Sequence, residues 1–431
     1  MNKTELLTPA GNLNNLRYAL AYGADAVYAG MPRYSLRVRN NDFHKLDNLA
    51  RGIRETRAAG KAFYLASNAL PHNAKIRTFI RDMEPVMELG PDALIMADPG
   101  LILMVRERWP DMPVHLSVQA NTMNYASVRF WQQQGIARII LSRELSLDQI
   151  EEIRQECPDM ELEVFVHGAL CIAYSGRCLL SGYFNHRDAN QGSCTNACRW
   201  DYKVRDAHVD ASGDVHATTA AQPAEQMYVL EESRRPGEHM PIEEDEHGTY
   251  IMNSKDLRAL EHVERLVKIG VHSLKIEGRT KSQYYVARTA QIYRQAIDDA
   301  EAGRPFNARL LGALDNLSNR GYTDGFLQRH PDQDYQNYLQ GCSGSLKQRF
   351  VGGVTGYDPH SGMAEIDVKN KFAVGDELEL IHPDGNRTFR LENMTDMDGK
   401  TMMVAPGGGY RVRIPLAGTD HAMGLLARNL S

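Results

Sequence analysis

Four of the six cysteines of this chain lie in one short stretch, with the spacing Cys171-x6-Cys178-x15-Cys194-x3-Cys198. Cysteines grouped in this way are typical of metal binding or redox chemistry. Structural zinc sites usually contain cysteine pairs about two to four residues apart, and only the second pair fits that spacing. Iron–sulfur clusters are commonly held by four thiolates. The spacing therefore favours an iron–sulfur cluster, with zinc or unrelated buried or redox thiols as alternatives.

Other residue types near the cysteines could assist such a centre. His167 lies four residues before Cys171, where it could act as a general acid or base or as a hydrogen-bond partner of the cluster ligands. A lone histidine at a strand end is also commonly just hydrogen-bonded within the fold. Aromatic residues in or beside the cysteine stretch could stack on a base or pack the loop; they are Tyr174, Tyr183, Phe184 and Trp200.

Basic residues recur near the predicted strand ends and could bind an anionic substrate. Guanidinium groups are the natural bidentate partners of carboxylates and also contact phosphates. Each one alone is more simply explained by a surface ion pair, but as a set on one face they favour an anion. The candidates are Arg33, Arg37, Arg39, Arg143, Lys275 and Arg279, with Arg177 and Arg199 beside the cysteines.

Short apolar runs alternate with helix-compatible segments through the first 300 residues, and eight of these runs are candidate strands. Segments compatible with helix follow most of them, such as Asn12–Tyr22 and Ser282–Gly303. Eight strands in this alternation, each a continuous apolar run, predict a TIM-like (β/α)8 barrel of the α/β class. The predicted strands are Glu5–Thr8, Ala26–Ala29, Ala62–Ala66, Ala93–Ala97, Val114–Val118, Arg138–Leu141, Leu162–Val166 and Ser273–Ile276.

Polar residues follow these strands at the end where a barrel of this class binds its substrates. One polar residue there is usually a helix cap, whereas several together favour a site. They include Asn68, Asp98, Gln119 with Asn121, Arg143-Glu144, His167 and Glu277-Gly278-Arg279.

The chain divides into a barrel over 1–330, a linker over 331–345 and a small antiparallel β-barrel over 346–431. An insertion at about 171–249 follows the seventh strand and carries the cysteines. Its second half is acidic, so we expect the cysteine half to be ordered by metal and the acidic half to be mobile. The C-terminal segment alternates short strands with turns, which predicts the β-barrel.

Composition is that of a globular protein, with 42% hydrophobic and 24% charged residues. No run approaches the roughly 20 apolar residues of a membrane span, and the N-terminus lacks an apolar signal region. We therefore expect a cytoplasmic protein with no membrane partner. A net charge of -6 argues against non-specific nucleic-acid binding over the whole surface but permits a local basic site.

The residues around the first two cysteines resemble peptidase family U32, the collagenase-like proteins. The matching pattern is Glu163-x-Phe165-x2-Gly168-Ala169-Leu170-Cys171-x4-Gly176-x-Cys178-x-Leu180-Ser181. Further segments, among them ELLTPAGN, DALIMADPG, LSVQANTMN, SLKIEGRTKS and KNKFAVGDELEL, resemble the branch of the family that hydroxylates transfer RNA. The resemblance covers most of the chain.

The resemblance implies a barrel with a [4Fe–4S] cluster on four cysteines. It further implies formation of 5-hydroxyuridine at the wobble position in the tRNA anticodon loop, with prephenate as co-substrate and without molecular oxygen. In some relatives the fourth cysteine lies further along the insertion; here Cys198 is the expected fourth ligand and Cys342 the competitor. Alternatives are hydroxylation of ribosomal RNA or a quinone precursor, peptidase activity, or a zinc-stapled binding module.

Overall fold

The structure is a computed structural model of the whole chain. It describes residues 3–31, 33–36, 41–170, 174–178, 190, 255–319, 321–328, 348–418 and 421–430, and six short strands between 207 and 249. The predicted linker, 331–345, lies outside the described residues, as does most of the insertion.

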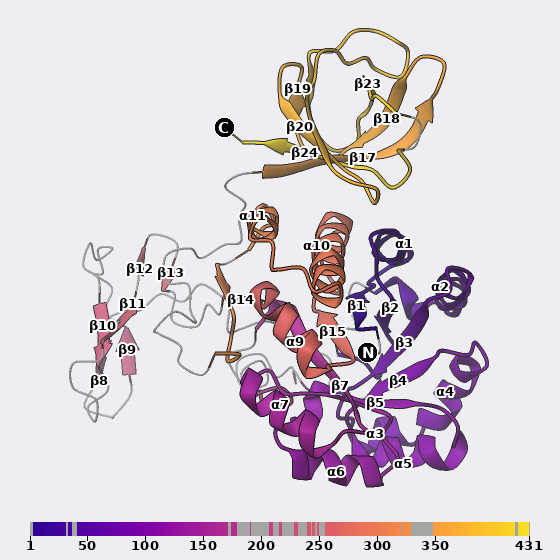
Figure 1. Cartoon of the computed structure of the whole chain (residues 1–431), viewed down its shortest axis with the longest axis vertical. Helices are drawn as coiled ribbons and strands as arrows, with labels where there is room; N and C mark the ends of the chain where they lie inside the picture. Colours follow the sequence, from indigo (N-terminus) through magenta and orange to yellow (C-terminus); the bar gives the residue numbers. More distant parts are fainter. Residues whose placement is uncertain are drawn as a thin grey trace.

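Eight parallel strands form a closed barrel in the order β15-β1-β2-β3-β4-β5-β6-β7, and β7 pairs back onto β15 (Figure 1). All eight predicted strands are present, which confirms the TIM-like barrel. Nearly all their residues are buried, as expected for strands covered on both faces. The strands are β1 (Glu5–Pro9), β2 (Ala26–Gly30), β3 (Ala62–Ser67), β4 (Ala93–Met96), β5 (Val114–Leu116), β6 (Arg138–Ile140), β7 (Glu161–Ala169) and β15 (Ser273–Ile276).

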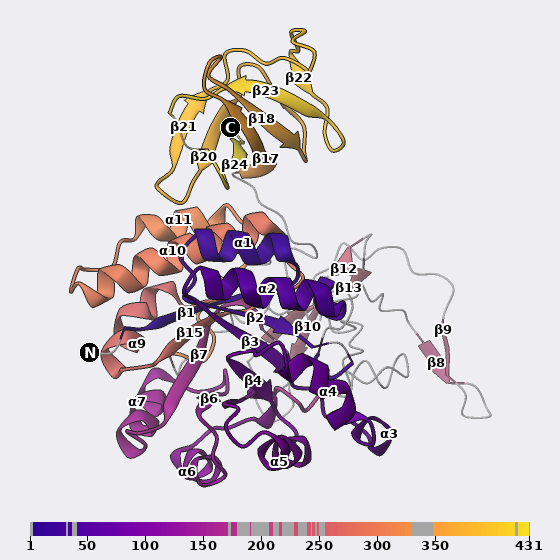
Figure 2. The same ribbon diagram turned by 90° about the vertical axis from the view of Figure 1, so that its right-hand side faces the viewer.

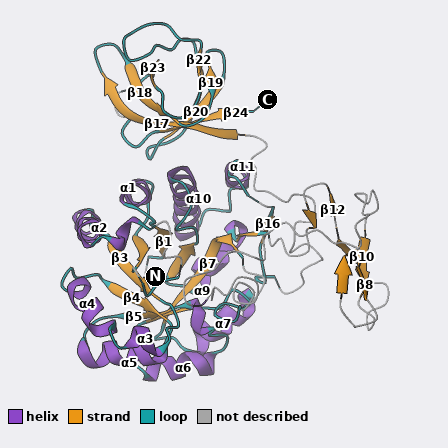
Figure 3. Ribbon diagram, turned by 180° about the vertical axis from the view of Figure 1, so that it is seen from behind, coloured by secondary structure: helices purple, strands orange, loops and turns teal. Residues whose placement is uncertain are grey.

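Helices surround the barrel on the outside (Figure 3). Side chains cap the first turns of five of them: Asn12, Asp98, Asn124, Ser146 and Ser282. Asp98, one of the polar strand-end residues, is thus a helix cap. No described helix is both long and apolar enough to cross a membrane. The helices are α1 (Leu13–Ala21), α2 (Leu46–Ala58), α3 (Asn73–Ile76), α4 (Phe79–Met87), α5 (Pro99–Arg108), α6 (Tyr125–Gln133), α7 (Leu147–Glu156), α9 (Val263–Ile269), α10 (Gln283–Glu301) and α11 (Arg309–Asp315).

Two strands that the sequence did not predict extend the barrel wall beyond β7. β14 (Asp256–Arg258) pairs antiparallel with the last residues of β7, and β16 (Tyr322–Thr323) pairs with β14. The segment after α11 therefore returns to the end of β7. Within the insertion the strands are β8 (Ala207–Val209), β9 (Val215–Ala217), β10 (Tyr228–Glu231), β11 (His239–Ile242), β12 (Glu244–Asp245) and β13 (Gly248–Thr249).

The C-terminal domain is antiparallel throughout, as predicted. Its main sheet has the order β21-β20-β24-β17-β18-β23, and a bridge between Thr395 and Arg413 links the segment after β21 to β23. A second apolar cluster, including Val351, Ile366 and Phe372, fills its interior. The strands are β17 (Gln348–Asp358), β18 (Met363–Val368), β19 (Phe372–Ala373), β20 (Glu377–Ile381), β21 (Arg387–Arg390), β22 (Val404–Ala405), β23 (Arg411–Pro415) and β24 (Leu425–Asn429).

This domain packs on the outer helices α1 and α10 (Figure 2). Ile381, Leu425 and Ala427 of the domain belong to the core of the barrel. Arg288 of α10 contacts the Glu379 carboxylate at 2.6 Å, with both side chains largely buried. An interface with shared apolar core and a buried ion pair holds the domain against the barrel.

Candidate active site

A buried ion pair fills the middle of the barrel lumen. The Lys275 ammonium donates to the Glu163 carboxylate at 2.7 Å, and both side chains are buried. The same ammonium lies 4.5 Å from the centre of the Tyr28 ring and 5.3 Å from that of Phe165. Burial lowers the pKa of Lys275, and the neighbouring Glu163 opposes that shift. Lys275, predicted to bind substrate, is therefore enclosed in the lumen with Glu163 as its ionic partner.

Arg138 extends this ion pair into a larger network, because it contacts both Glu163 and a second carboxylate, Glu5. Its Nη1 lies 2.6 Å from Glu5 and 3.5 Å from Glu163. Glu5 also accepts hydrogen bonds from the Tyr64 and Ser273 hydroxyls, both at 2.7 Å. Each of these buried charges faces an opposite one, which burial requires. These residues therefore form a buried polar network inside the barrel.

Two predicted arginines lie near the same two aromatic rings as Lys275. The Arg143 guanidinium lies 3.9 Å from the centre of the Phe165 ring, and its Nη1 donates to the Ala169 carbonyl at 2.9 Å. The Arg279 guanidinium lies 5.8 Å from the Tyr28 ring. Cations over aromatic faces are attracted by the ring quadrupole, which fixes the position of both guanidinium groups. The barrel mouth thus has an aromatic floor with two guanidinium groups upon it.

The loop after β2 is fastened to this mouth at Leu36. Its carbonyl accepts from Arg279 Nη2 at 2.7 Å, and its N–H donates to Asn68 Oδ1 at 3.2 Å. Arg37 and Arg39 follow directly and lie outside the described residues.

Arg33, from the same loop, takes a different direction. Its Nη1 pairs with Asp82 of α4 at 2.8 Å, and its side chain is half exposed. The Tyr34 hydroxyl donates to the same carboxylate at 2.8 Å. Arg33 thus ties the loop to the helical layer and does not point at the mouth residues described above.

The cysteine stretch reaches the mouth through Cys178. At Gly176 a Cβ atom would lie 2.4 Å from the Gln119 carbonyl oxygen, so only glycine allows this close approach to the turn after β5. Asn190 donates to the Cys178 carbonyl at 3.3 Å and accepts from the Leu70 N–H at 3.0 Å. Cys178 is half buried and carries a free thiol. It therefore lies between the loops that follow β3 and β5.

The rest of the cysteine constellation lies outside the described residues: Cys171, Cys194 and Cys198, and the competitor Cys342. Tyr174, the predicted stacking residue, is described and 48% exposed. The described residues contain no group of three or more histidine, cysteine or acidic side chains that could hold a metal. Cys157 is buried at the end of α7, which agrees with its interpretation as an ordinary thiol.

His167 packs against the helical layer because β7 contains an irregularity. Lys275 pairs with Phe165 but Ile276 pairs with His167, so one extra residue of β7 is inserted. Such a bulge reverses the alternation of side chains between the two faces. The His167 ring consequently lies among Tyr285, Tyr293 and Tyr322, with ring centres 5.5 to 5.7 Å away.

This cage holds His167 in the neutral form. Burial lowers the pKa of His167 to about 3, and its Nδ1 lies 3.4 Å from the Tyr293 hydroxyl. Sequence reasoning missed the three tyrosines. Tyr285 and Tyr293 lie on the same face of α10, a spacing that could have indicated them, whereas Tyr322 comes from β16 and left no such signal. A catalytic role of His167 stays a prediction, and its surroundings favour one in orienting the end of β7.

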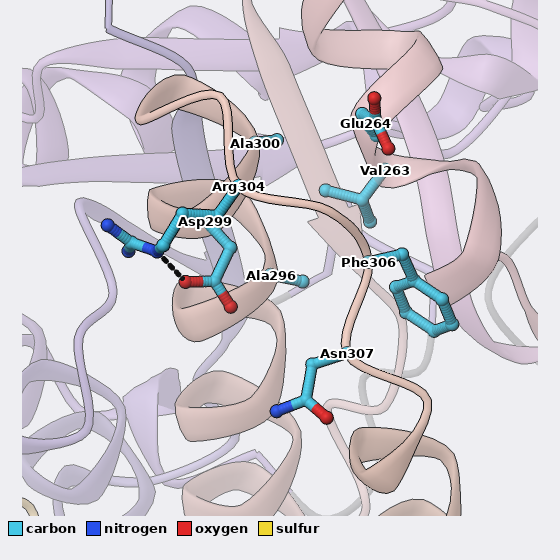
Figure 4. A pocket seen from close by; sticks show the side chains of 8 residues that line it. All are labelled: Val263, Glu264, Ala296, Asp299, Ala300, Arg304, Phe306 and Asn307. Atoms are coloured by element: carbon cyan, nitrogen blue, oxygen red, sulfur yellow. Dashed lines mark hydrogen bonds and ion pairs between the residues drawn. The ribbon is translucent and has the colours of Figure 1, made fainter.

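A cavity between α9 and α10 is not a second site. Its volume is about 10 Å³, and the Arg304–Asp299 pair at 2.6 Å lies at its edge (Figure 4). A space of this size holds a single water at most. This cavity is therefore too small to bind a substrate.

The fold and the mouth define a TIM-like barrel whose C-terminal face combines a cysteine loop with stacked arginines. The sequence model of peptidase family U32 matches residues 11–337, and that of the peptidase family U32 C-terminal domain matches residues 347–428. The chain belongs to peptidase family U32, which confirms the resemblance found in the sequence.

Two relatives share most of their sequence with this chain. "tRNA hydroxylation protein P" of Escherichia coli is 60% identical, over 100% of this chain and 98% of that protein. "tRNA hydroxylation protein P" of Haemophilus influenzae is 56% identical, over 95% of this chain and 92% of that protein. Among solved structures, the U32 peptidase Mk0906 is 12% identical and covers 64% of this chain and 93% of its own, with a TM-score of 0.38.

Proposed function

We propose that this chain is an enzyme that hydroxylates tRNA. The observation that carries this proposal is the 60% identity to a tRNA hydroxylation protein over the full length of the chain. The alignment covers both the barrel and the C-terminal domain, so the two proteins share both domains.

The product we propose is 5-hydroxyuridine at the wobble position, made with prephenate and without molecular oxygen. A wobble base is unpaired in its loop, so moving it into the barrel mouth costs little. Prephenate is a dicarboxylate, and the Arg143 and Arg279 guanidinium groups lie near the Phe165 and Tyr28 rings, 3.9 and 5.8 Å from the ring centres. Carboxylates bind guanidinium groups with paired hydrogen bonds, which supports prephenate at this floor.

The cofactor we propose is a [4Fe–4S] cluster on Cys171, Cys178, Cys194 and Cys198. Two features fit the group: four thiols form a complete donor set, and Cys178 is a free thiol beside the mouth. When bound, the cluster supplies the redox capacity that amino-acid side chains lack.

The remaining roles fall to the residues around the mouth. Arg143 and Arg279 bind and orient the carboxylates, and Arg37 and Arg39 contact RNA phosphates or prephenate from the adjoining loop. Tyr174, which is exposed, stacks on the extruded base. His167 orients the last residues of β7, from which the cysteine loop begins, and so acts as a positioning residue.

The cofactor proposal is tested by cysteine substitution with a matched control. Protein purified without dioxygen is assayed for iron and acid-labile sulfide as the wild type, as Cys178→Ala and as Cys157→Ala. We expect bound iron and sulfide to fall at least severalfold in Cys178→Ala and to stay unchanged in Cys157→Ala, whose thiol lies in the α7 region. A wild type that carries stoichiometric zinc and no sulfide would refute the cluster.

The function is tested in cells that lack the gene. The same variants are returned to the deletion strain, and nucleosides derived from 5-hydroxyuridine are measured in total tRNA by mass spectrometry. Wild type and Cys157→Ala should restore them, and Cys178→Ala should not. Restoration by Cys178→Ala would contradict its role in the reaction.

A further inference from the structure

One end of the C-terminal domain exposes apolar and basic side chains together. The described residues include nine large hydrophobic side chains that are exposed, and three of them lie here: Met403 at 62%, Tyr410 at 48% and Val404 at 39%. Their neighbours are basic. We name this surface the β22–β23 patch, formed by Lys369, Lys371, Met403, Val404, Tyr410 and Arg411.

Strand pairing brings these residues together. Val404 pairs with Ala373, which places β22 beside the turn that carries Lys371. The Val368 N–H donates to the Tyr410 carbonyl at 3.0 Å, next to Lys369. Arg411 pairs with Asp367 on β18. Three chain segments therefore form one continuous surface.

Two of the three cations of this patch are available to a ligand. Lys369 pairs with Asp367 at 2.8 Å. Within the described part of the chain, Lys371 and Arg411 have no ion-pair partner, and both are exposed. Between the apolar residues and Arg411 lies the run Gly407-Gly408-Gly409, where no side chain shields the backbone N–H groups. Cationic side chains and exposed backbone N–H groups bind phosphates, and an exposed tyrosine can stack on a base.

We propose that the β22–β23 patch binds RNA, namely the part of the tRNA substrate outside the anticodon loop. This inference rests on the proposed function. A net charge of -6 argues against non-specific RNA binding over the whole surface but permits a local site, and this patch combines exposed cations with an exposed tyrosine. Figure 2 shows the N-terminus, where β1 starts, at the left of the barrel and β22 toward the right of the C-terminal domain. The patch therefore lies toward the same side as the carboxyl ends of the barrel strands, where the anticodon loop is proposed to enter.

The test compares binding of two RNAs to the full chain by fluorescence anisotropy. The probes are an unmodified tRNA transcript and its isolated anticodon stem-loop. In Lys371→Glu/Arg411→Glu we expect at least tenfold weaker binding of the tRNA and little change for the stem-loop. The slope of log K against log salt should fall by roughly one to two, because each phosphate contact contributes a little under one. Tyr410→Ala should weaken tRNA binding about threefold or more through lost stacking.

The control variant is Arg390→Glu, compared with Arg411→Glu alone. Both change the net charge equally, but Arg390 lies on β21 and is not one of the patch residues. Circular dichroism confirms that each variant is folded. Equal tRNA binding by wild type and patch variants overturns the inference, as does a patch that captures a protein partner while its RNA affinity is unchanged. Neither result bears on tRNA hydroxylation itself, which the nucleoside measurement tests separately.

Discussion

The lumen of the barrel and the layer behind β7 accommodate buried polar groups in opposite ways. In the lumen, Lys275, Glu163 and Arg138 each lie within ion-pair distance of an oppositely charged side chain. Behind β7, His167 lies among three tyrosines and is neutral, with a pKa of about 3. The two regions are separated only by the direction in which successive β7 side chains point. The comparison shows two ways in which this wall buries ionisable side chains: by pairing them with an opposite charge, or, at His167, by burial that favours the neutral form.

Breaking the lumen pair should have the largest effect on stability. In Lys275→Met the Glu163 carboxylate loses its closest cation while remaining buried. We expect a loss of about 3–5 kcal/mol in the free energy of unfolding, measured by urea denaturation. The double variant Lys275→Met/Glu163→Leu removes both charges and should recover much of that loss. If Lys275→Met were as stable as wild type, Arg138 alone would be sufficient to stabilise the buried Glu163 carboxylate.

Lowering the pH should reduce the free energy of unfolding through His167, the neutral group behind β7. The folded pKa of His167 is about 3 and the unfolded value about 6.5, so the unfolded state takes up the proton first as pH falls. The stabilising contribution is complete above pH 6.5 and is lost at about 1.4 kcal/mol per pH unit below it. In His167→Phe the fall in unfolding free energy from pH 7 to pH 5 should be smaller by about 2 kcal/mol. His360→Phe, at a nearly fully exposed position, is the control and should behave as wild type.

The mouth should respond through binding and not through stability. Arg143→Lys keeps the charge but loses the planar stack on Phe165, so prephenate should bind about tenfold more weakly by calorimetry. Arg108→Lys makes the same substitution at a surface arginine 5.6 Å from the centre of the Trp109 ring and should leave prephenate binding unchanged. Equal binding by all three proteins would place the carboxylates elsewhere.

Arg33 should give the smallest effect. Its pair with Asp82 is half exposed, so Arg33→Ala should cost less than about 1 kcal/mol in thermal unfolding. Because its side chain points to α4, tRNA modification in cells should be unchanged. If Arg33→Ala lost tRNA modification without losing stability, the sequence-based prediction that Arg33 binds substrate would be supported.

The barrel could be predicted from the sequence because its strands are continuous apolar runs separated by helical segments. The eight strand positions agree with the structure to within about three residues at each end. Arg143 and Arg279 follow parallel strands, and the structure places them near the Phe165 and Tyr28 rings; that they bind substrate stays a prediction.

Three features could not be predicted for physical reasons. The lumen position of Lys275 depends on which face a mid-strand residue takes, and an apolar run on both faces hides that alternation. The bulge before His167 has no signature in residue types, yet it reverses the direction of that side chain. The cage tyrosine Tyr322 reaches His167 only because β16 pairs with β14, a contact between segments distant in the chain.

The most direct test of the central claim is the content of 5-hydroxyuridine-derived nucleosides in tRNA from cells grown without dioxygen, where oxygen-dependent enzymes are silent. We predict none in the deletion strain, full restoration by wild type and by Arg33→Met, and little restoration by Arg143→Met. Unchanged levels of these nucleosides in the deletion strain would contradict the account.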